Sequence, residues 1–546
     1  MVIQQTPLAR LLTPIFMLLF HAPVQAQSAP KLVLGITVDQ MRWDYLFRFR
    51  DRWSPQGGIR RMMNDGFSCN NTQINYLPSY TASGHAGIYT GTVPAIHGIT
   101  GNSWWDNNKQ EYVYCTEDDT AKTVGSSTDA GHMSPVNLLT TTIGDEIKLA
   151  TNFRNKTIGI ALKDRGGIIA AGRSADAAYW YEAESGQWIT SSYYMQEIPA
   201  WVKKFNSPAR VDSMYKLDWH LLYPAETYVQ SIYDRKGFDV RTFGSSERKF
   251  PYGLKRNVGK DYSILSATPH GNTLTTEFAK AAILNEQMGA DSITDLLAVS
   301  YSSTDYIGHA YGPNSLEIED AFLRLDKELG QFFDFLDKQV GKGAWVVFLT
   351  ADHGMAHVPG FMKVNKMSAG LVDDKVLTNQ LNEALKQQFG VENLTKGISN
   401  AQVILNVDLI KKTKKLGQSD VAEFVITWLE SQEGISRAIR LMDASRSAIP
   451  DHLATQIKNG YFPLRSGHIQ ILYKSGYIEG FANGGSTHGS GYAYDTHIPL
   501  LWYGWKIKHG QSARNMTMSD IAPTLAALLN IQEPSGSVGN VIYELY

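Results

Sequence analysis

Two short segments in the middle of the chain contain the residue types that bind transition metals. The first is Ser-Thr-Asp305-Tyr-Ile-Gly-His309, and the second, further along, is Leu-Thr-Ala-Asp352-His353-Gly. Carboxylates and imidazoles together form the mixed oxygen and nitrogen ligand set that zinc prefers. Asp305 and His309 are four residues apart, so one helical turn places both side chains on the same face.

The second segment follows an apolar run, residues 344–349, that is typical of a buried strand. Ligands at the carboxyl end of such a strand lie where open α/β sheets bind their substrates. Each segment alone also fits a structural role, because Asp-His-Gly can form a turn and Asp-x-x-x-His can be a solvated helix pair. Since both segments follow predicted strands, together they favour a metal site.

A third acid and a third histidine extend this set. Asp39 ends the apolar run 31–38, and His488 stands in the loop Gly-Gly-Ser-Thr-His488-Gly-Ser-Gly. Three carboxylates and three imidazoles suit two zinc ions bridged by a substrate, roughly 4 Å apart. Considered singly, each residue also fits a structural role: Asp39 could be a helix cap, and His488 could be a loop residue that binds no metal.

A nucleophile and phosphate-binding groups are also present. Thr81 precedes a short helical stretch, so its hydroxyl lies at a helix N-terminus, where anions bind. A threonine hydroxyl is a weak nucleophile until its pKa is lowered, which a zinc ion in contact with it would do. Lys163 and Arg165 are two residues apart at the end of a predicted strand and can bind phosphate oxygens from one side. Asn102 could donate to a further oxygen. Lys163 and Arg165 by themselves favour a solvated loop over a phosphate site.

The elements that must position these groups alternate along the chain. Continuous apolar runs predict five strands at residues 31–38, 157–162, 296–300, 345–349 and 497–503. Helical patterns separate them, and the clearest has apolar residues at helical spacing over residues 318–336. This alternation predicts an α/β fold with a mostly parallel central sheet and helices on both faces.

Two stretches interrupt the alternation. Residues 170–260 are rich in Trp, Tyr, Ser and Pro, which predicts an irregular insertion. Residues 365–480 contain Lys-rich helical segments and short strand-like runs, which predict an inserted α+β subdomain. The catalytic core would then comprise residues 27–364 and 481–546.

Composition and the N-terminus narrow the class of protein. The chain has 546 residues, of which 43% are hydrophobic, so it is globular; its net charge of −2 excludes a nucleic-acid polymer as partner. Arg10, an apolar run and Val24-Gln25-Ala26 indicate a signal peptide over residues 1–26, cleaved after Ala26. The run is shorter than the ~20 residues that span a bilayer. We therefore expect a protein of the periplasm or the medium, without a membrane anchor.

The chain has two cysteines, Cys69 and Cys115. In an oxidising compartment they could form a bridge, and the sequence leaves this open.

The ordered motifs resemble the alkaline phosphatase superfamily, and specifically the phosphate-irrepressible alkaline phosphatases of flavobacteria. The resemblance runs from about Lys31 to the C-terminus. Its motifs are Val-Asp39-Gln-Met-Arg-Trp, the Thr81 segment, His97-Gly-Ile-Thr-Gly-Asn102, Leu-Lys163-Asp-Arg165, the Asp305 and Asp352 segments, Thr-His488, Asp495-Thr-His-Ile-Pro-Leu and Asp520-Ile-Ala-Pro-Thr.

The resemblance implies a role for each residue of the site. One zinc ion would be held by Asp305, His309 and His488; the other, which also contacts Thr81, by Asp39, Asp352 and His353. Asn102, Lys163 and Arg165 would bind the non-bridging phosphoryl oxygens. Lys163 stands where better-known alkaline phosphatases keep a magnesium site, so no third Mg²⁺ is expected. Tyr80 before Thr81 and Gly-Ser-Gly after His488 are departures that leave the fine specificity open.

The resulting prediction is an exported, zinc-dependent alkaline phosphatase with two Zn²⁺ per chain. It would act as a monomer on small-molecule phosphate monoesters through a phosphothreonine at Thr81. One alternative is a nucleotide pyrophosphatase/phosphodiesterase of the same superfamily, which would lack the clamp of Lys163 and Arg165. An alternative of another class is a non-catalytic exported binding protein, which need not keep the nucleophile together with all six metal ligands.

Overall fold

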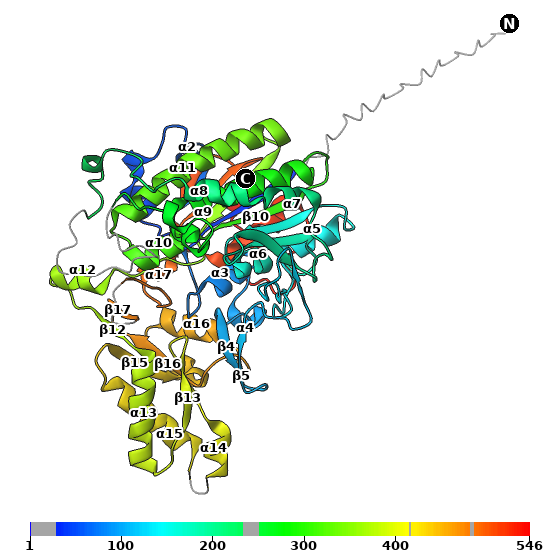
Figure 1. Cartoon of the computed structure of the whole chain (residues 1–546). Coiled ribbons are helices and arrows are strands. Elements are labelled where there is room, and N and C mark those ends of the chain that lie inside the picture. Colours follow the sequence, from blue (N-terminus) through cyan, green and yellow to red (C-terminus); the bar gives the residue numbers. More distant parts are fainter. Residues whose placement is uncertain (2–28, 233–249, 414–415, 481–484) are drawn as a thin grey trace.

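A ten-stranded sheet forms the centre of the computed structural model, which describes residues 1, 29–232, 250–413, 416–480 and 485–546 (Figure 1). The strands, in their order across the sheet, are β20 (Gly510–Ser512), β2 (Phe67–Cys69), β19 (Leu500–Gly504), β11 (Trp345–Thr350), β1 (Leu32–Val38), β10 (Asp295–Tyr301), β7 (Thr157–Ala161), β8 (Ala177–Glu182), β9 (Gln187–Ser191) and β6 (Thr123–Val124).

The five strands from β11 to β8 are parallel, and antiparallel pairs flank them on both sides. All residues of these five strands are buried, because helices cover both faces. The mostly parallel α/β class predicted from the sequence is therefore confirmed.

Helices lie on both faces of the sheet because two strand-to-strand connections run toward opposite edges of it. The crossover from β10 to β11 contains α11 (Leu316–Leu336), and the crossover from β7 to β8 contains α6 (Asp164–Ala171). Right-handed crossovers in opposite directions place their helices on opposite faces. Helix α11 packs against α2 (Gly58–Asp65) and α9 (Pro269–Asn285), whereas α6 packs against α3 (Thr81–Thr90) (Figure 1).

Two sequence predictions about strands need correction. The predicted strand 497–503 is divided at Pro499: β18 (His497–Ile498) pairs in a separate three-stranded sheet, and only β19 joins the central sheet. Proline cannot donate to a strand ladder, which explains the break. Residues 170–260 are not irregular throughout, because β8 and β9 extend the central sheet. Their aromatic side chains are buried on both faces, so they show no alternation of polar and apolar residues.

A second sheet has its own hydrophobic core, away from the first (Figure 1). Its strands, in order, are β13 (Thr395–Ser399), β14 (Gln402–Leu405), β16 (Ile469–Tyr473) and β15 (Ile435–Arg440). The helices α13 (Asp374–Phe389) and α15 (Gln418–Glu430) contribute side chains to this core. An inserted α+β subdomain is therefore present, and its limits at residues 365 and 480 stay a prediction.

The predicted signal peptide lies outside the described residues, apart from Met1. No helix in the described ranges is both long and apolar enough to cross a membrane. Cys69 and Cys115 are buried free thiols, so the structure contains no bridge between them.

Candidate active site

The predicted site residues come together at the carboxyl edge of the central sheet. Asp39 follows β1, Lys163 follows β7, and Asp352 follows β11. Asp305 lies in the first turn of α10 (Ser303–Tyr311), directly after β10. Because these strands are parallel and adjacent, their carboxyl ends meet at one place.

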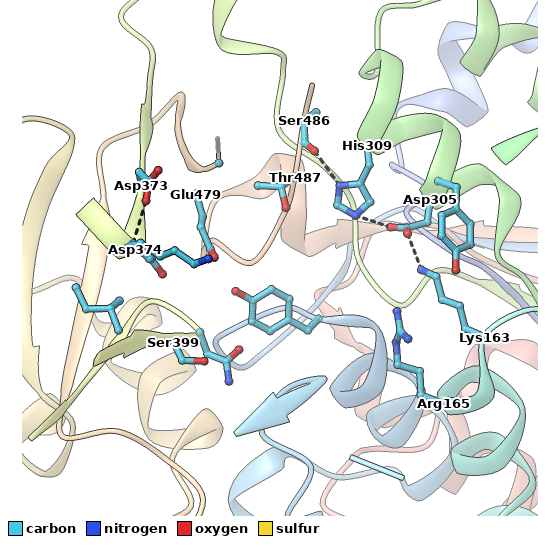
Figure 2. A pocket seen from close by; sticks show the side chains of 16 residues that line it. Lys163, Arg165, Asp305, His309, Asp373, Asp374, Ser399, Glu479, Ser486 and Thr487 are labelled. Atoms are coloured by element: carbon cyan, nitrogen blue, oxygen red, sulfur yellow. Dashed lines mark hydrogen bonds and ion pairs between the residues drawn. The ribbon is translucent and has the colours of Figure 1, made fainter. Parts of the chain in front are cut away.

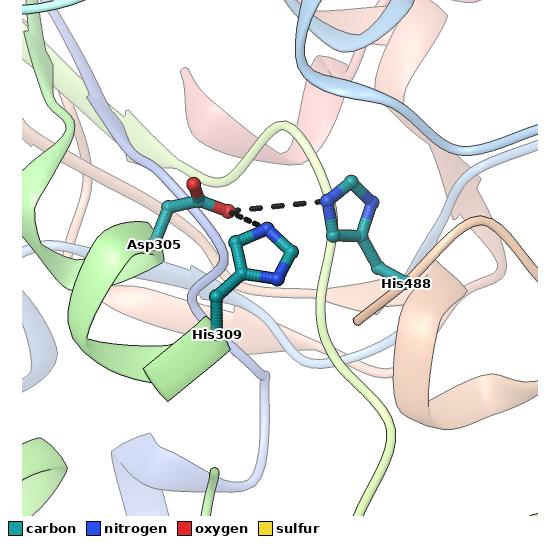
Figure 3. Close-up of side chains that lie close together, drawn as sticks. All are labelled: Asp305, His309 and His488. Carbon is teal, nitrogen blue, oxygen red and sulfur yellow. Dashed lines mark ion pairs between the residues drawn. The ribbon is translucent and has the colours of Figure 1, made fainter. Parts of the chain in front are cut away.

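Asp305, His309 and His488 form the first half-site (Figure 3). The Nε2 atom of His309 lies 3.2 Å from Asp305 Oδ1. The Nε2 atom of His488 lies 3.9 Å from the same oxygen. Asp305 and His309 share one face of α10, as their spacing predicts, whereas His488 approaches from a distant loop.

The residues expected to hold the second zinc ion, Asp39, Asp352 and His353, lie together beside Thr81 and are called the second half-site. His353 Nε2 lies 3.5 Å from Asp39 Oδ1 and 3.6 Å from Asp352 Oδ2. The same nitrogen lies 3.3 Å from the hydroxyl of Thr81. Asp305 also reaches this half-site, since one of its oxygens groups with ligand atoms of Asp39 and His353 within 4.8 Å. The two half-sites are thus in direct contact through Asp305.

Three histidines of the site have the same hydrogen-bond arrangement. Each places Nδ1 2.8 to 2.9 Å from a backbone carbonyl oxygen. The pairs are His309 with Ser486, His353 with Gly354, and His488 with Ser79. A carbonyl only accepts, so we assign a ring proton to Nδ1 of each, which leaves a lone pair on Nε2 of the neutral rings of His353 and His488. Burial opposes the charge of His309, but Asp305 outweighs it and raises the pKa of that ring. Metal-binding imidazoles are held in this way.

The lone pairs therefore face carboxylate oxygens, which are acceptors too. Asp39 Oδ1 and Asp352 Oδ2 are buried without a hydrogen-bond partner in the described part of the chain, and both lie near His353 Nε2. Acceptors that face acceptors in a buried site need a cation or a proton between them. The donor set of imidazole nitrogens and carboxylate oxygens fits zinc.

Lys163 supplies positive charge to the same carboxylates. Its Nζ atom donates to Asp39 Oδ2 at 2.7 Å and to Asp305 Oδ2 at 2.5 Å. Burial opposes the charge of Lys163, but the attraction of Asp305 and Asp39 outweighs it and raises the lysine pKa. Burial also acts against ionised Asp305, yet His309 and Lys163 keep its pKa well below the ordinary range.

Burial dominates at the other two carboxyls. It raises the pKa of Asp39 well above the ordinary range, with the charges of Asp305 and Asp352 adding to the effect. It also raises the pKa of Asp352, to about 6. Without further cations these acids would hold protons, which is consistent with a site built for metal ions.

Thr81 is the first residue of α3, and the preceding residue provides no side-chain cap. The Asn102 carbonyl oxygen Oδ1 accepts from the backbone N–H of Ala82 at 3.0 Å. The Asn102 amide group must therefore point its two donors elsewhere, and it has no other side-chain partner within the described ranges. It is free to donate to an anion beside Thr81.

A cavity of about 650 Å³ opens in front of these groups (Figure 2). Lys163, Arg165 and Asp305 line one wall, and Asp374 and Glu479 lie across from them. The opposite wall comes from the inserted subdomain and its connections, which the sequence could not assign to the site.

Gln40 is a site residue that the sequence analysis did not single out. Its backbone N–H donates to Asp352 Oδ1 at 3.1 Å, and its side-chain amide donates to Asp305 Oδ1 at 2.7 Å. It therefore links one acid of each half-site. Its position directly after Asp39 was the only available signal.

Taken together, the sheet edge and its buried ligands define an α/β enzyme with a metal centre next to an anion-binding helix N-terminus. Known proteins agree. Residues 33–481 match the model of the type I phosphodiesterase / nucleotide pyrophosphatase family. Alkaline phosphatase PhoV of Synechococcus elongatus is 47% identical over 523 residues, which are 95% of this chain and 94% of PhoV.

Two further relatives are similar over nearly their whole length. A protein of Myroides odoratus named calcium-transporting ATPase is 47% identical over 519 residues, 94% of each chain. Alkaline phosphatase PafA of Elizabethkingia meningoseptica is 44% identical over 526 residues, 95% of each chain. A crystal structure of PafA superposes with a TM-score of 0.91 and covers 95% of this chain and 99% of its own. The chain belongs to the type I phosphodiesterase / nucleotide pyrophosphatase family, in the branch of the PhoV and PafA alkaline phosphatases.

Proposed function

We propose that this alkaline phosphatase hydrolyses small-molecule phosphate monoesters with two bound zinc ions and through a phosphothreonine on Thr81. One observation carries the proposal: Nε2 of the neutral His353 ring faces the buried carboxylates of Asp39 and Asp352 directly beside the Thr81 hydroxyl. Such an arrangement suits cations, and the adjacent hydroxyl is the group that those cations would activate.

The zinc ions would be divided between the two half-sites. Asp305, His309 and His488 would hold one ion, and Asp39, Asp352 and His353 the other. When bound, zinc lowers the pKa of nearby hydroxyl groups and neutralises charge on phosphoryl oxygens. No third Mg²⁺ site is proposed, because Lys163 already supplies a cation to Asp39 and Asp305.

The residues of the chain then act in two displacements. Thr81 Oγ gives up its proton and forms a bond to phosphorus while the bond from phosphorus to the leaving-group oxygen breaks, and the leaving group departs as an alcohol after taking up a proton. Water next attacks phosphorus, the bond from phosphorus to Thr81 Oγ breaks, and Thr81 Oγ takes up a proton as inorganic phosphate leaves. Lys163, Arg165 and the amide of Asn102 hold the non-bridging oxygens through both steps, so catalysis depends mainly on position and charge.

The clamp favours monoesters over diesters. A monoester carries one more negative charge on its non-bridging oxygens, and Lys163 and Arg165 interact with that charge. The family description includes diesterases, so the family alone leaves this choice open. The names of PhoV and PafA support the monoesterase. The name of the Myroides relative implies ATP hydrolysis, which the same phosphoryl chemistry could perform.

Residues 1–26 would direct export and be removed, and the enzyme would act as a monomer in the periplasm or the medium. A binding protein without catalysis would have no need of a nucleophile at the centre of its ligand cluster.

The test compares an aryl phosphate, a matched aryl diester and ATP as substrates, with and without a zinc chelator. We expect chelator-sensitive turnover, with the monoester faster than the diester. Thr81→Ala should abolish the acid-stable phosphoenzyme that forms from radiolabelled substrate. Faster diester turnover would overturn the monoesterase, unchanged activity in Thr81→Ala would overturn the phosphothreonine, and one zinc per chain would contradict the division into two half-sites.

A further inference from the structure

A hydrogen-bonded network connects Arg165 to a hairpin outside the cavity. The hairpin consists of β4 (Ser103–Asp106) and β5 (Glu111–Tyr114). The Tyr114 hydroxyl donates to Asp164 Oδ1 at 2.9 Å, and Arg165 donates from a terminal nitrogen to the same hydroxyl at 3.0 Å. Tyr114 does not line the cavity, whereas Arg165 does.

The direction of each hydrogen bond is determined by chemistry. A guanidinium group only donates and an ionised carboxylate only accepts, so the single phenol proton must go to Asp164. The other oxygen of Asp164 accepts from Thr116 at 2.5 Å, which keeps the carboxylate in place. Burial raises the pKa of Tyr114 well above its ordinary value, so the phenol keeps this proton in alkaline solution.

The same hairpin also positions Asn102. This residue directly precedes β4, and its carbonyl accepts from the N–H of Cys115 at 3.0 Å. Ser103 pairs with Tyr114 across the hairpin. Two of the groups assigned to the phosphoryl oxygens are therefore held from one hairpin: Asn102 by the backbone and Arg165 through Tyr114.

The hairpin lies beside the inserted subdomain, which forms hydrogen bonds with it (Figure 1). Asn400 donates from its side chain to the carbonyl of Ser103 at 2.7 Å. Asn107, in the turn of the hairpin, donates to the carbonyl of Ser466 at 2.9 Å. Because these contacts hold both ends of the hairpin in place, the position of Tyr114, and with it the hydroxyl that accepts from Arg165, is well defined.

We propose that Tyr114 is a positioning residue that orients the Arg165 guanidinium toward the phosphoryl group and thereby sets the preference for monoesters over diesters. An arginine side chain has many rotamers, and one fixed partner on a terminal nitrogen selects those that point the remaining donors into the cavity. The inference rests on the proposed role of Arg165, through which Tyr114 acts.

The experiment measures kcat/KM for an aryl phosphate and a matched aryl diester, together with inhibition by inorganic phosphate. Tyr114→Phe should lower kcat/KM for the monoester roughly ten-fold, the effect of one hydrogen bond to a charged group. Diester turnover should change far less, and the inhibition constant of phosphate should rise in parallel with the monoester loss. Tyr112→Phe is the matched control, because Tyr112 lies on the same strand and its side chain is exposed.

A second background separates the inference from the proposed function. In Arg165→Ala, adding Tyr114→Phe should have no further effect on either substrate, because the interaction is already lost. If Arg165→Ala itself leaves the monoester preference unchanged, the proposed role of Arg165 fails. If Arg165→Ala removes the preference but Tyr114→Phe does not reduce it, the inference fails alone. Equal losses on monoester and diester in a normally folded Tyr114→Phe would also overturn it, since they indicate a structural role.

Discussion

The imidazole rings of His353 and His488 stack face to face, with centroids 3.4 Å apart and planes inclined by 11°. The two residues belong to different half-sites and come from distant parts of the chain. Stacking at this distance excludes two charged rings. Burial lowers the pKa of His353 to about 3, and burial together with His353 lowers that of His488 well below its ordinary value. Both rings are therefore neutral, which is the form that binds a metal ion.

Removal of the metal ions should destabilise the fold. The ligands include buried carboxylates that must take up protons or repel one another when the ions are gone, so chelation should lower the free energy of unfolding. The expected loss is about 3 kcal/mol for each zinc ion removed, relative to zinc at roughly a hundred times its dissociation constant. Calorimetry before chelation, after chelation and after adding back two equivalents of zinc measures this. An unchanged melting temperature in a fully metal-free sample would contradict it.

Lys163 should matter most for stability when the metal ions are absent. In the metal-free chain its ammonium group is the cation closest to Asp39 and Asp305. Lys163→Met leaves these buried carboxyls without it, and breaking a buried pair costs about 3–5 kcal/mol. Urea unfolding at pH 8 should show this loss in the chelated protein and a smaller one with zinc. An equal loss in both states would refute the explanation.

The sequence predicted which acids follow strands and meet at the edge of the sheet, and not the contacts that hold them there. Asp39, Asp305 and Asp352 each follow a buried apolar run, and parallel strands bring such positions together whatever the details of packing. The supports depend on tertiary contacts: Gln40 reaches across to Asp305, and the subdomain supplies the outer wall of the cavity. No local sequence pattern encodes these contacts, because each one joins segments that are far apart in the sequence and meet only in the folded chain.

Gln40 should tune the affinity of both half-sites for zinc. Gln40→Ala removes the side-chain amide that donates to Asp305. The backbone N–H of residue 40 can still donate to Asp352, but no side-chain contact then holds this residue in place. Loss of such an outer support weakens metal binding about 10–100-fold. Competition with a chromophoric chelator measures the affinity directly, without reference to turnover.

The matched control for this change is Gln110→Ala. Gln110 is an exposed glutamine that shares the left-handed backbone of Gln40, with φ of 60° against 67°. Alanine therefore meets the same backbone strain at both positions. A similar loss of zinc affinity in the two variants would assign the effect to strain and not to the amide of Gln40.

Far from the site, Glu328 should make stability depend on pH. It lies on α11 and accepts from the hydroxyl of Thr273 at 3.2 Å, and burial raises its pKa from 4.5 to about 7. The folded state then holds a proton that the unfolded state has released between these pH values, so stability decreases as pH rises from 4.5 to 7. Glu328→Gln keeps an acceptor for Thr273 and removes the charge. The stability of this variant relative to the unaltered protein should therefore be on the order of 3 kcal/mol greater at pH 8 than at pH 4.5. Urea unfolding at both pH values checks this, with the exposed Glu184→Gln as control. If the free energies of unfolding of the variant and the unaltered protein differ by the same amount at both pH values, the ionised form of Glu328 does not destabilise the fold and the prediction is wrong.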